Sequence, residues 1–321
     1  MTTVDVVVVN WNGAEVVGDC LRSVVAHRSE HEVRIVLVDN DSRDDSLVVA
    51  RDAAPGASVV RTGENLGFAG GVQAGIAASD GDVVVLLNND ATLVAGFVDA
   101  AVARLLGSPS LGAVTGRLLL LEPRADGVRL INSTGVEITA SGNGRDRDWL
   151  RAEDEGSGSP REVFGLCGGA AALRRTALDD VGGFDPTLFL YYEDTDLSWR
   201  LRLAGWAIEY EREATVLHRH AHSTVEGSPL FVRQNTRNRL VVATRYAPPS
   251  VVLRAWAATI VRTARLGVSA SLGRGSRDTA RAVRRGLASA VGALPRDLAT
   301  RRRWNRRSVL SSSARRSLIS R

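Results

Sequence analysis

The chain has 321 residues, of which 44% are hydrophobic and 24% are charged. This balance is typical of one large globular domain with an appendage, or of two modest domains, and it excludes a disordered chain. No uninterrupted apolar run approaches the ~18 residues that a membrane-spanning helix needs, and the first five residues lack the basic start of a signal peptide. With only two cysteines, the sequence predicts neither a disulfide framework nor a structural zinc site. We therefore expect a soluble intracellular protein.

The positive charge is concentrated at the C-terminal end. The sequence has no lysine, and 17 of its 41 arginines lie in residues 250–321, where Asp278 and Asp297 are the only acids. Residues 1–249 hold 24 arginines and 34 acids, so the net charge is about −10 for the body and about +15 for the tail. This asymmetry predicts an anionic partner for the tail, such as membrane lipid, nucleic acid or another protein.

The first 120 residues alternate between strand-like and helix-like segments. β-branched runs predict strands over residues 4–9, 33–38, 58–61 and 83–87. Helical spacing of apolar residues covers 16–26, 46–53, 70–78 and 94–105. The alternation predicts an α/β fold, with a Rossmann-like, mostly parallel sheet flanked by helices. Ligands of such sheets bind beyond the carboxyl ends of the strands, so the loops that follow the strands are candidate binding loops.

The pattern continues less regularly to residue 247. A Gly/Ser/acid-rich loop covers residues 141–160, and Pro248 and Pro249 end the last predicted helix of this part. Predicted strands lie near 207–210 and 214–218, and predicted helices cover 197–204 and 230–246. We expect one domain over residues 1–247, with halves 1–120 and 121–247. Residues 248–321 then form a basic, helical and partly disordered tail.

Polar residues follow the first, second and fourth predicted strands. Asn10-Trp11-Asn12-Gly13 stands where a dinucleotide-binding protein has G-x-G-x-x-G, which argues against an NAD- or FAD-dependent oxidoreductase. Asp39 either accepts hydrogen bonds from a ribose or base, or closes a turn. Asp90, in Asn88-Asn89-Asp90, either holds a divalent cation or caps a helix. Because both acids reach the same edge of one sheet, together they predict a pocket for a nucleotide and a metal.

An acidic cluster and a histidine cluster lie in the second half. Glu193, Asp194 and Asp196 follow the apolar, aromatic run 188–192. They either complement a helix dipole or, with pKa values raised by apolar neighbours, supply a general base. His218, His220 and His222 would share one face of a strand, which allows either metal binding or a polar loop. We favour one functional histidine over a three-histidine metal site.

The ordered set of these motifs resembles a known enzyme family. The residues that carry the resemblance are Asn10-Trp11-Asn12, Asp39-Asn40-x-Ser42, Asn65-x-Gly67-Phe68-Ala69-x-Gly71, Asn88-Asn89-Asp90, Gly183-Phe184-Asp185, Tyr192-Glu193-Asp194-x-Asp196-Leu197, Gly205-Trp206, His218 and Thr236-Arg237-Asn238. Over residues 4–245 the chain is similar to the inverting family 2 glycosyltransferases of the GT-A fold, and within them to the rhamnosyltransferase-like branch.

The resemblance implies a nucleotide-sugar donor and transfer of the sugar with inversion, and we favour dTDP-rhamnose as the donor, with a UDP-sugar as the alternative. Nucleotide-sugar binding is then expected from Asn10, Trp11, Asn12, Asp39, Asn65, Gly67, Asn89, Asp90 and Arg237. The resemblance also implies a divalent cofactor, Mn²⁺ or Mg²⁺, bound by Asp90 and His218. Asn88 replaces the first acid of the family's D-x-D motif, which weakens the expected metal site.

The resemblance implies that Asp194 is the catalytic base, and Glu193 is the competing choice, because adjacent residues cannot both point at one acceptor. The implied acceptor is a hydroxyl of a cell-envelope glycan, linked in many such systems to a polyprenyl lipid. Residues 164–172 are expected to approach this acceptor, with Cys167 as a packing residue rather than a nucleophile.

The tail combines arginines with apolar residues at helical spacing. Arg254, Arg262 and Arg265 accompany an apolar stripe, and a second basic stretch covers residues 277–291. A basic amphipathic helix is typical of membrane-surface binding, and no motif supports nucleic acid as the partner. We expect a cytoplasmic enzyme bound peripherally at the inner face of the plasma membrane. Two alternatives stay open, a sugar nucleotidyltransferase and a non-catalytic, membrane-associated module that binds nucleotide sugars.

Overall fold

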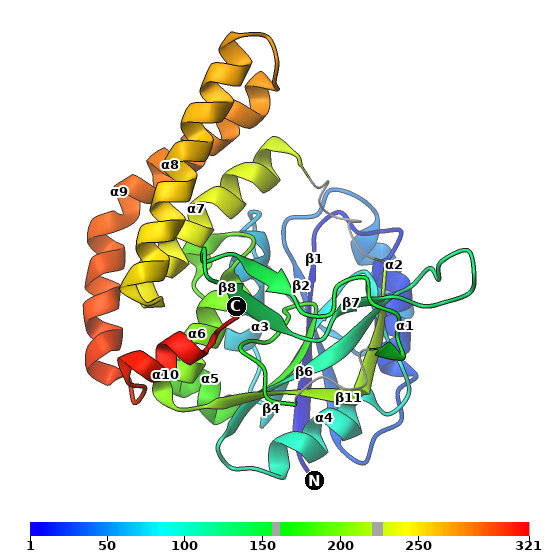
Figure 1. The fold of residues 1–321 in the computed structure, drawn as a ribbon. Helices are drawn as coiled ribbons and strands as arrows, with labels where there is room; N and C mark the ends of the chain where they lie inside the picture. The colour runs from blue at the N-terminus through cyan, green and yellow to red at the C-terminus, as the bar shows by residue number, and fades with distance from the viewer. Residues whose placement is uncertain (156–160, 220–226, 321) are drawn as a thin grey trace.

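The computed structural model describes residues 1–155, 161–219 and 227–320 (Figure 1). Among these residues, a nine-stranded sheet has the order β3-β2-β1-β4-β10-β6-β11-β5, with β7 paired to β6. Helices cover both faces of this sheet, and a second sheet of three short strands has the order β12-β8-β9 (Figure 1). The predicted α/β fold with a flanked central sheet is confirmed.

The parallel half of the sheet contains β1 (Thr3–Asn10), β2 (Glu32–Asp39), β3 (Ser58–Arg61) and β4 (Val83–Asn88). The helices of this half are α1 (Val17–Val25), α2 (Ser46–Ala53), α3 (Gly67–Ala77) and α4 (Phe97–Leu106). Valines alternate along β1, so that Val6 and Val8 pack with α1 and α4 while Val7 packs with α3. The register sets Asn10 beside Asp39 and Val9 beside Asn88, which brings the carboxyl ends of three strands together.

The second half of the sheet includes reversed strands that the sequence did not predict. Its strands are β5 (Ala91–Leu93), β6 (Leu111–Leu120), β7 (Ile131–Ser133), β10 (Ala170–Arg174) and β11 (Ala207–His218). β10 runs antiparallel between β4 and β6, and β5 runs antiparallel to β11 at the edge. The two strands predicted near 207–210 and 214–218 form one strand, β11, whose register shifts between Tyr210 and Thr215.

The rest of the domain consists of the small sheet and the helices that follow β10 and β11 in the chain. The small sheet contains β8 (Val136–Thr139), β9 (Gly144–Asp146) and the C-terminal β12 (Ile319–Ser320). The helices are α5 (Arg175–Val181), the 3₁₀ turn η2 (Pro186–Leu188), α6 (Glu193–Ala204) and α7 (Pro229–Tyr246). α6 begins four residues before the predicted start, so its first turn carries Glu193, Asp194 and Asp196.

The basic tail folds into α8 (Pro249–Ser271), α9 (Arg277–Arg307) and α10 (Ser312–Ser317). α8 and α9 form a hairpin whose far end extends away from the body, while α9 runs back along α7 (Figure 1). Trp304 of α9 is buried, with its ring centroid 6.4 Å from that of Tyr246 in α7. Where the sequence allowed for partial disorder, the structure describes helices up to Ser317. Within the described ranges, no helix is both long and apolar enough to cross a bilayer.

A buried ion network joins the tail to the rest of the fold. Arg245 of α7 donates to Asp185 at 2.7 Å, to Asp196 of α6 at 3.0 Å and to Asp297 of α9 at 2.8 Å. Arg200 of α6 donates to the second oxygen of Asp196 at 2.7 Å. Because all of these charges except that of Asp185 are almost completely buried, the network fixes α9 against the first turn of α6.

Candidate active site

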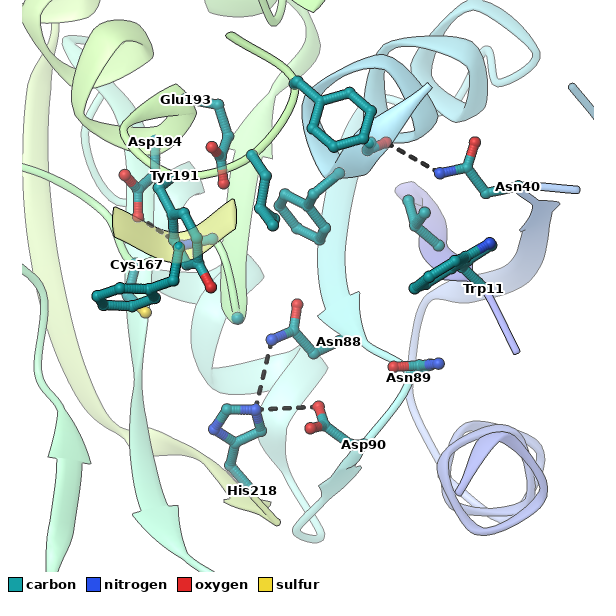
Figure 2. Close-up of a pocket in the computed structure, with 18 of the residues that line it drawn as sticks. Trp11, Asn40, Asn88, Asn89, Asp90, Cys167, Tyr191, Glu193, Asp194 and His218 are labelled. Carbon is teal, nitrogen blue, oxygen red and sulfur yellow. Dashed lines mark hydrogen bonds and ion pairs between the residues drawn. The ribbon is translucent and has the colours of Figure 1, made fainter. Parts of the chain in front are cut away.

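A cavity of about 380 Å³, called the main cavity below, opens at the carboxyl ends of the strands (Figure 2). The ends of β1, β4, β6 and β11, the loop before β10 and the first turn of α6 contribute to its walls. Of the residues predicted for the site, those that line it are Trp11, Asn65, Gly67, Asn89, Asp90, Glu193, Asp194 and His218. The parallel strand ends therefore meet the acidic cluster from the second half at one cavity.

Two of the predicted asparagines support the loops behind the wall. The buried Asn10 donates to the hydroxyl of Ser46 at 2.9 Å and accepts from Asn89 at 2.9 Å. Asn12 accepts from the backbone N–H of Arg43 at 2.8 Å. Neither Asn10 nor Asn12 lines the main cavity. Their side chains hold the loops after β1, β2 and β4 to one another, and this brings Trp11 to the rim, where 43% of its surface is exposed.

Asp39 closes the turn after β2, because its carboxylate accepts from the backbone N–H of Ser42 at 3.2 Å. It is buried and does not line the cavity, whereas the neighbouring Asn40 does. Asn40 donates to the carbonyl of Gly67 at 3.0 Å and to the side chain of Asn65 at 3.1 Å. Gly67 has a φ of +70°, and a Cβ there would overlap the carbonyl oxygen of Phe189. The sequence motif contained Asn40, but its role as the link between these loops appears only in the structure.

Asp90 and His218 meet at one end of the main cavity (Figure 2). His218 Nε2 lies 3.0 Å from Asp90 Oδ1 and 3.4 Å from Asn88 Nδ2, while His218 Nδ1 lies 2.5 Å from Asn132 Oδ1. If Nδ1–H donates to Asn132, then Nε2 turns its lone pair toward the carboxylate of Asp90. That contact becomes attractive when a proton or a cation lies between the two atoms.

This donor set fits a divalent metal with few protein ligands. Among the described residues, no group of three or more His, Cys, Asp and Glu side chains converges on one point. One carboxylate and one imidazole oriented by Asn132 still suit a Mn²⁺ or Mg²⁺ ion that takes its other ligands from phosphate oxygens and water. His220 and His222 lie outside the described residues, so the structure carries no statement about the three-histidine arrangement.

The acid pair Glu193–Asp194 begins α6 on the opposite side of the main cavity (Figure 2). Asp194 accepts from the backbone N–H of Gly168 at 3.3 Å and from that of Thr195 at 2.5 Å. The buried Glu193 has one carboxylate oxygen, Oε2, without a hydrogen-bond partner among the described residues. The two carboxyl groups therefore face the same cavity with different surroundings.

These surroundings separate the acidities of the pair. Burial raises the pKa of Glu193 well above its usual range, and the negative charge of Asp194 raises it further. Burial also raises the pKa of Asp194, but the N–H groups of Gly168 and Thr195 counter this by stabilising its charge. A proton shared by the pair is therefore held by Glu193, which leaves Asp194 as the carboxylate able to accept another proton.

The loop before α6 is strained and is held from α7. Phe189, Tyr191 and Tyr192 have φ values of +63°, +68° and +70°. Residues other than glycine rarely adopt this region of backbone conformation. Asn238 of α7 holds this loop, because its buried amide donates to the carbonyls of Leu188, Leu190 and Tyr191 at 2.7–2.9 Å. The sequence motif around Asn238 gave no indication of this role.

Arg237, predicted to contact the diphosphate, does not line the main cavity. Its guanidinium donates to Asn238 at 2.5 Å. Loss of water and the positive charges of Arg296, on α9, and Arg245 lower its pKa. The structure therefore does not bring Arg237 together with Asp90 and His218.

Two further residues line the cavity, Cys167 and Asp146. Burial raises the pKa of Cys167 well above its usual range, so its thiol stays protonated near neutral pH. Asp146 is exposed at the cavity. Partial loss of water around its carboxylate and the charge of Asp194 raise the pKa of Asp146 to about 6, although Ser133 and His218 act in the opposite direction. The sequence analysis gave no role to Asp146, which lies in the irregular stretch where no periodic signal marks a site.

The family model described as glycosyl transferase family 2 matches residues 5–182, more than half of the chain. The chain belongs to this family. The acids and the polar strand ends around the main cavity are thus the candidate active site of a glycosyltransferase. Membership in this family also favours a glycosyltransferase over the two alternatives from the sequence, a sugar nucleotidyltransferase and a non-catalytic module that binds nucleotide sugars.

Relatives of this glycosyltransferase include enzymes that transfer rhamnose. It is 32% identical over 214 residues to the N-acetylglucosaminyl-diphospho-decaprenol L-rhamnosyltransferase of Mycobacterium tuberculosis, a match that covers 61% of this chain and 69% of that protein. It is 25% identical over 197 residues to the O-antigen chain rhamnosyltransferase RfbN of Salmonella typhimurium, covering 60% and 59%. Both names agree with the rhamnosyltransferase-like branch that the motifs resemble.

Solved structures of glycosyltransferases share the fold. GalNAc-T7, solved with UDP, GalNAc and Mn²⁺, superposes with a TM-score of 0.64 at 15% identity over 93% of this chain and 57% of its own. The mannosyltransferase PcManGT of Pyrobaculum calidifontis, solved with GDP-Man and Mn²⁺, gives 0.55 at 18% identity over 92% and 87%. The fold of this chain is that of the GT-A glycosyltransferases.

Proposed function

We propose that this glycosyltransferase moves rhamnose from dTDP-rhamnose to a hydroxyl of a lipid-linked cell-envelope glycan, with inversion at the anomeric carbon. A UDP-sugar is the alternative donor. The proposal depends on one observation, which is that a single cavity has Asp90 and His218 at one end and the Glu193–Asp194 pair across from them (Figure 2). The motifs, the family and the two rhamnosyltransferase relatives support the choice of donor.

Asp194 acts as the general base in this proposal. Its carboxylate accepts the proton of the acceptor hydroxyl while the acceptor oxygen bonds to the anomeric carbon. The bond between that carbon and the diphosphate breaks on the opposite face, so the configuration inverts and the nucleoside diphosphate leaves. Glu193 holds its own proton and keeps a second negative charge away from the sugar.

In this proposal, Asp90 and His218 would hold a divalent cation at the end of the cavity that receives the diphosphate of the donor. When bound, Mn²⁺ or Mg²⁺ neutralises the charge that develops on the leaving diphosphate. Asn132 keeps the imidazole of His218 turned toward this position through the contact at Nδ1. Two solved structures that share the fold contain Mn²⁺, which supports a divalent cation as the cofactor.

The nucleoside end of the donor lies along the loops after β1, β2 and β3. Trp11 at the rim offers an aromatic face to the base, while Asn40, Asn65 and Gly67 offer polar groups to the ribose. Asn89 lines the cavity, and Asp39 acts from behind this wall in the proposal. Arg237 is left out, since it does not line the cavity.

The enzyme acts at the inner face of the plasma membrane in this proposal, held there by its basic tail. The exposed side of α8 carries Leu253, Ile260 and Val268 beside Arg254 and Arg265. Apolar groups flanked by arginines suit the interface of an anionic membrane. A lipid-linked acceptor, as named for the mycobacterial relative, would be held at the same surface.

Transfer by the purified chain tests this function directly. The assay combines dTDP-rhamnose, Mn²⁺ and N-acetylglucosaminyl diphosphate carried on a short polyprenyl chain. We expect a rhamnosylated product with the anomeric configuration opposite to that of the donor, and we expect EDTA to stop its formation. Retention of configuration would overturn the mechanism, and transfer from UDP-sugars alone would overturn the choice of donor.

A further inference from the structure

Asp146, on β9, connects two cavities. It lines the main cavity together with Asp194 and His218. It also lines a second cavity, formed by Glu137, Arg145, Arg147, Asp148, Trp149 and Arg151. Within the described part of the chain, Asp146 is the one residue shared by the two sets. Asp146 therefore lies where the second cavity borders the cavity that contains Asp194.

The strand that carries Asp146 is tied to the catalytic helix. β9 pairs with β8, with Val136 opposite Asp146. The backbone N–H of Gly144 on β9 donates to the hydroxyl of Tyr192 at 3.2 Å. Tyr192 is the residue directly before Glu193 in the chain. Asn143, just ahead of the strand, accepts from Arg239 of α7 at 2.7 Å. The carboxylate of Asp146 is thus held at a defined place relative to Asp194, as a recognition group requires.

Asp146 has neighbours from both ends of the main cavity. Asp194 and His218 both act on the pKa of Asp146, and Ser133 and Cys167 are hydrogen-bonding groups beside it. Asp146 and Asp194 also both raise the pKa of Cys167. The charge of Asp194 acts on Asp146 more strongly than His218 does, which agrees with a place near the acceptor hydroxyl that Asp194 deprotonates in the proposed function.

The second cavity has the composition of a sugar site rather than of an anion site. Its arginines are balanced by acids, since Arg145 pairs with Glu137 at 2.8 Å and Arg151 with Asp148 at 2.9 Å. Trp149 presents an aromatic surface that is 39% exposed. An aromatic face beside carboxylates and guanidinium groups matches the alternating apolar and hydroxyl surfaces of a sugar ring.

We propose that Asp146 and Trp149 form the acceptor-sugar subsite, in which Asp146 binds a hydroxyl next to the one that reacts and Trp149 contacts the face of the sugar. This inference depends on the proposed function, because it names the part of the same site that receives the acceptor. The occupant is the sugar of a glycan acceptor, and neither the nucleotide nor the metal uses these two residues.

Steady-state kinetics of Asp146→Asn and Trp149→Ala test the subsite with the donor and acceptor of the assay above. A carboxylate that binds a hydroxyl should lose its charged hydrogen bond in Asp146→Asn, so we expect the KM for the acceptor to rise about tenfold. Trp149→Ala should raise it similarly, and Trp149→Phe should restore most of the wild-type value. The KM for the donor and the slow hydrolysis of donor without acceptor should change less than about twofold in both Trp149 variants.

Equilibrium binding of the acceptor to dTDP-saturated protein supplies a readout that needs no turnover. Asp146→Asn and Trp149→Ala should weaken this binding while dTDP binding stays unchanged. An unchanged acceptor Kd in both variants, or a loss of dTDP binding in Asp146→Asn, would overturn the subsite. Failure of the proposed function looks different, because wild-type protein would then neither transfer rhamnose nor bind the acceptor.

Discussion

At the scale of single residues, the Glu193–Asp194 pair predicts opposite results for two conservative changes. Asp194→Asn removes the carboxylate that accepts a proton, so we expect transfer to fall about 10²–10⁴-fold. Glu193→Gln replaces the carboxyl group whose pKa burial raises well above its usual range with a neutral group of the same shape, so we expect activity within about tenfold of wild type. Initial rates of transfer, together with unchanged dTDP binding, measure both effects.

The pH dependence of the rate provides a second measurement of the same pair. Because burial raises the pKa of Asp194, the base loses its charge at a higher pH than an ordinary aspartate, and the rate should fall as the pH drops through that raised value. The inflection should persist in Glu193→Gln, since the inflection belongs to Asp194, while burial and the charge of Asp194 raise the pKa of Glu193 well above its usual range. Near wild-type rates in Asp194→Asn with an inactive Glu193→Gln would reverse the assignment.

The contact between His218 and Asp90 predicts that nucleotide binding depends on metal through one carboxylate. Asp90→Asn leaves the imidazole facing a neutral amide, which binds a divalent cation more weakly. We expect the Kd of dTDP measured with Mn²⁺ to rise about tenfold or more, while the Kd measured in EDTA changes little. Calorimetric titration of the same sample under both conditions is its own control. Equal weakening with and without Mn²⁺ would remove Asp90 from the metal site.

At the scale of elements, Arg245 should be among the most important residues for stability outside the apolar core. Arg245→Met leaves Asp185, Asp196 and Asp297 without their shared cation, and a buried charge that loses its partner costs about 3–5 kcal/mol. Chemical denaturation should record a loss of this size in the free energy of unfolding. Arg254→Met, on the exposed side of α8, is the matched control and should change it by less than about 0.5 kcal/mol. Equal, small losses would mean that the network contributes little.

Local sequence patterns predicted the strands of the first half of the chain. The β-branched runs predicted β1 to β4, of which β1 and β4 are buried on both faces, and the polar residues after the strands predicted the cavity edge. The reversed direction of β10 could not be read in the same way, because strand direction depends on pairing between residues far apart in the chain. For the same reason, Asp146 carried no signal. Its role depends on β9 lying beside α6 through the contact between Gly144 and Tyr192.

At the scale of the whole molecule, the tail both completes the fold and exposes a basic surface. The sequence predicted an apolar face on α8, but the structure divides that face between two uses. Val251 is buried, and Trp256 donates to Thr244 of α7 at 3.0 Å. Leu253 and Ile260 remain 72% and 53% exposed. Helical periodicity alone could not separate these groups, because both belong to the same apolar pattern and only the position of α7 distinguishes them.

This division makes membrane binding testable without disturbing the core. The exposed arginines of α8 should each contribute about 1 kcal/mol, or roughly fivefold, to binding of an anionic surface. In sedimentation with phosphatidylglycerol vesicles, Arg254→Gln/Arg265→Gln should therefore bind roughly 25-fold more weakly, and Leu253→Ser/Ile260→Ser should also lose affinity because apolar contacts with the lipid are removed. Arg28→Gln, an exposed change in the N-terminal half, should bind like wild type.

Salt and lipid charge provide further controls on the wild-type protein. It should dissociate from phosphatidylglycerol vesicles at high salt, because screening weakens the attraction, and it should not bind phosphatidylcholine vesicles, because neutral lipid offers no such attraction. If neither double variant weakens binding while the fold is intact, the surface that meets the membrane lies elsewhere on the chain, and the arginine excess of the tail serves another anionic partner.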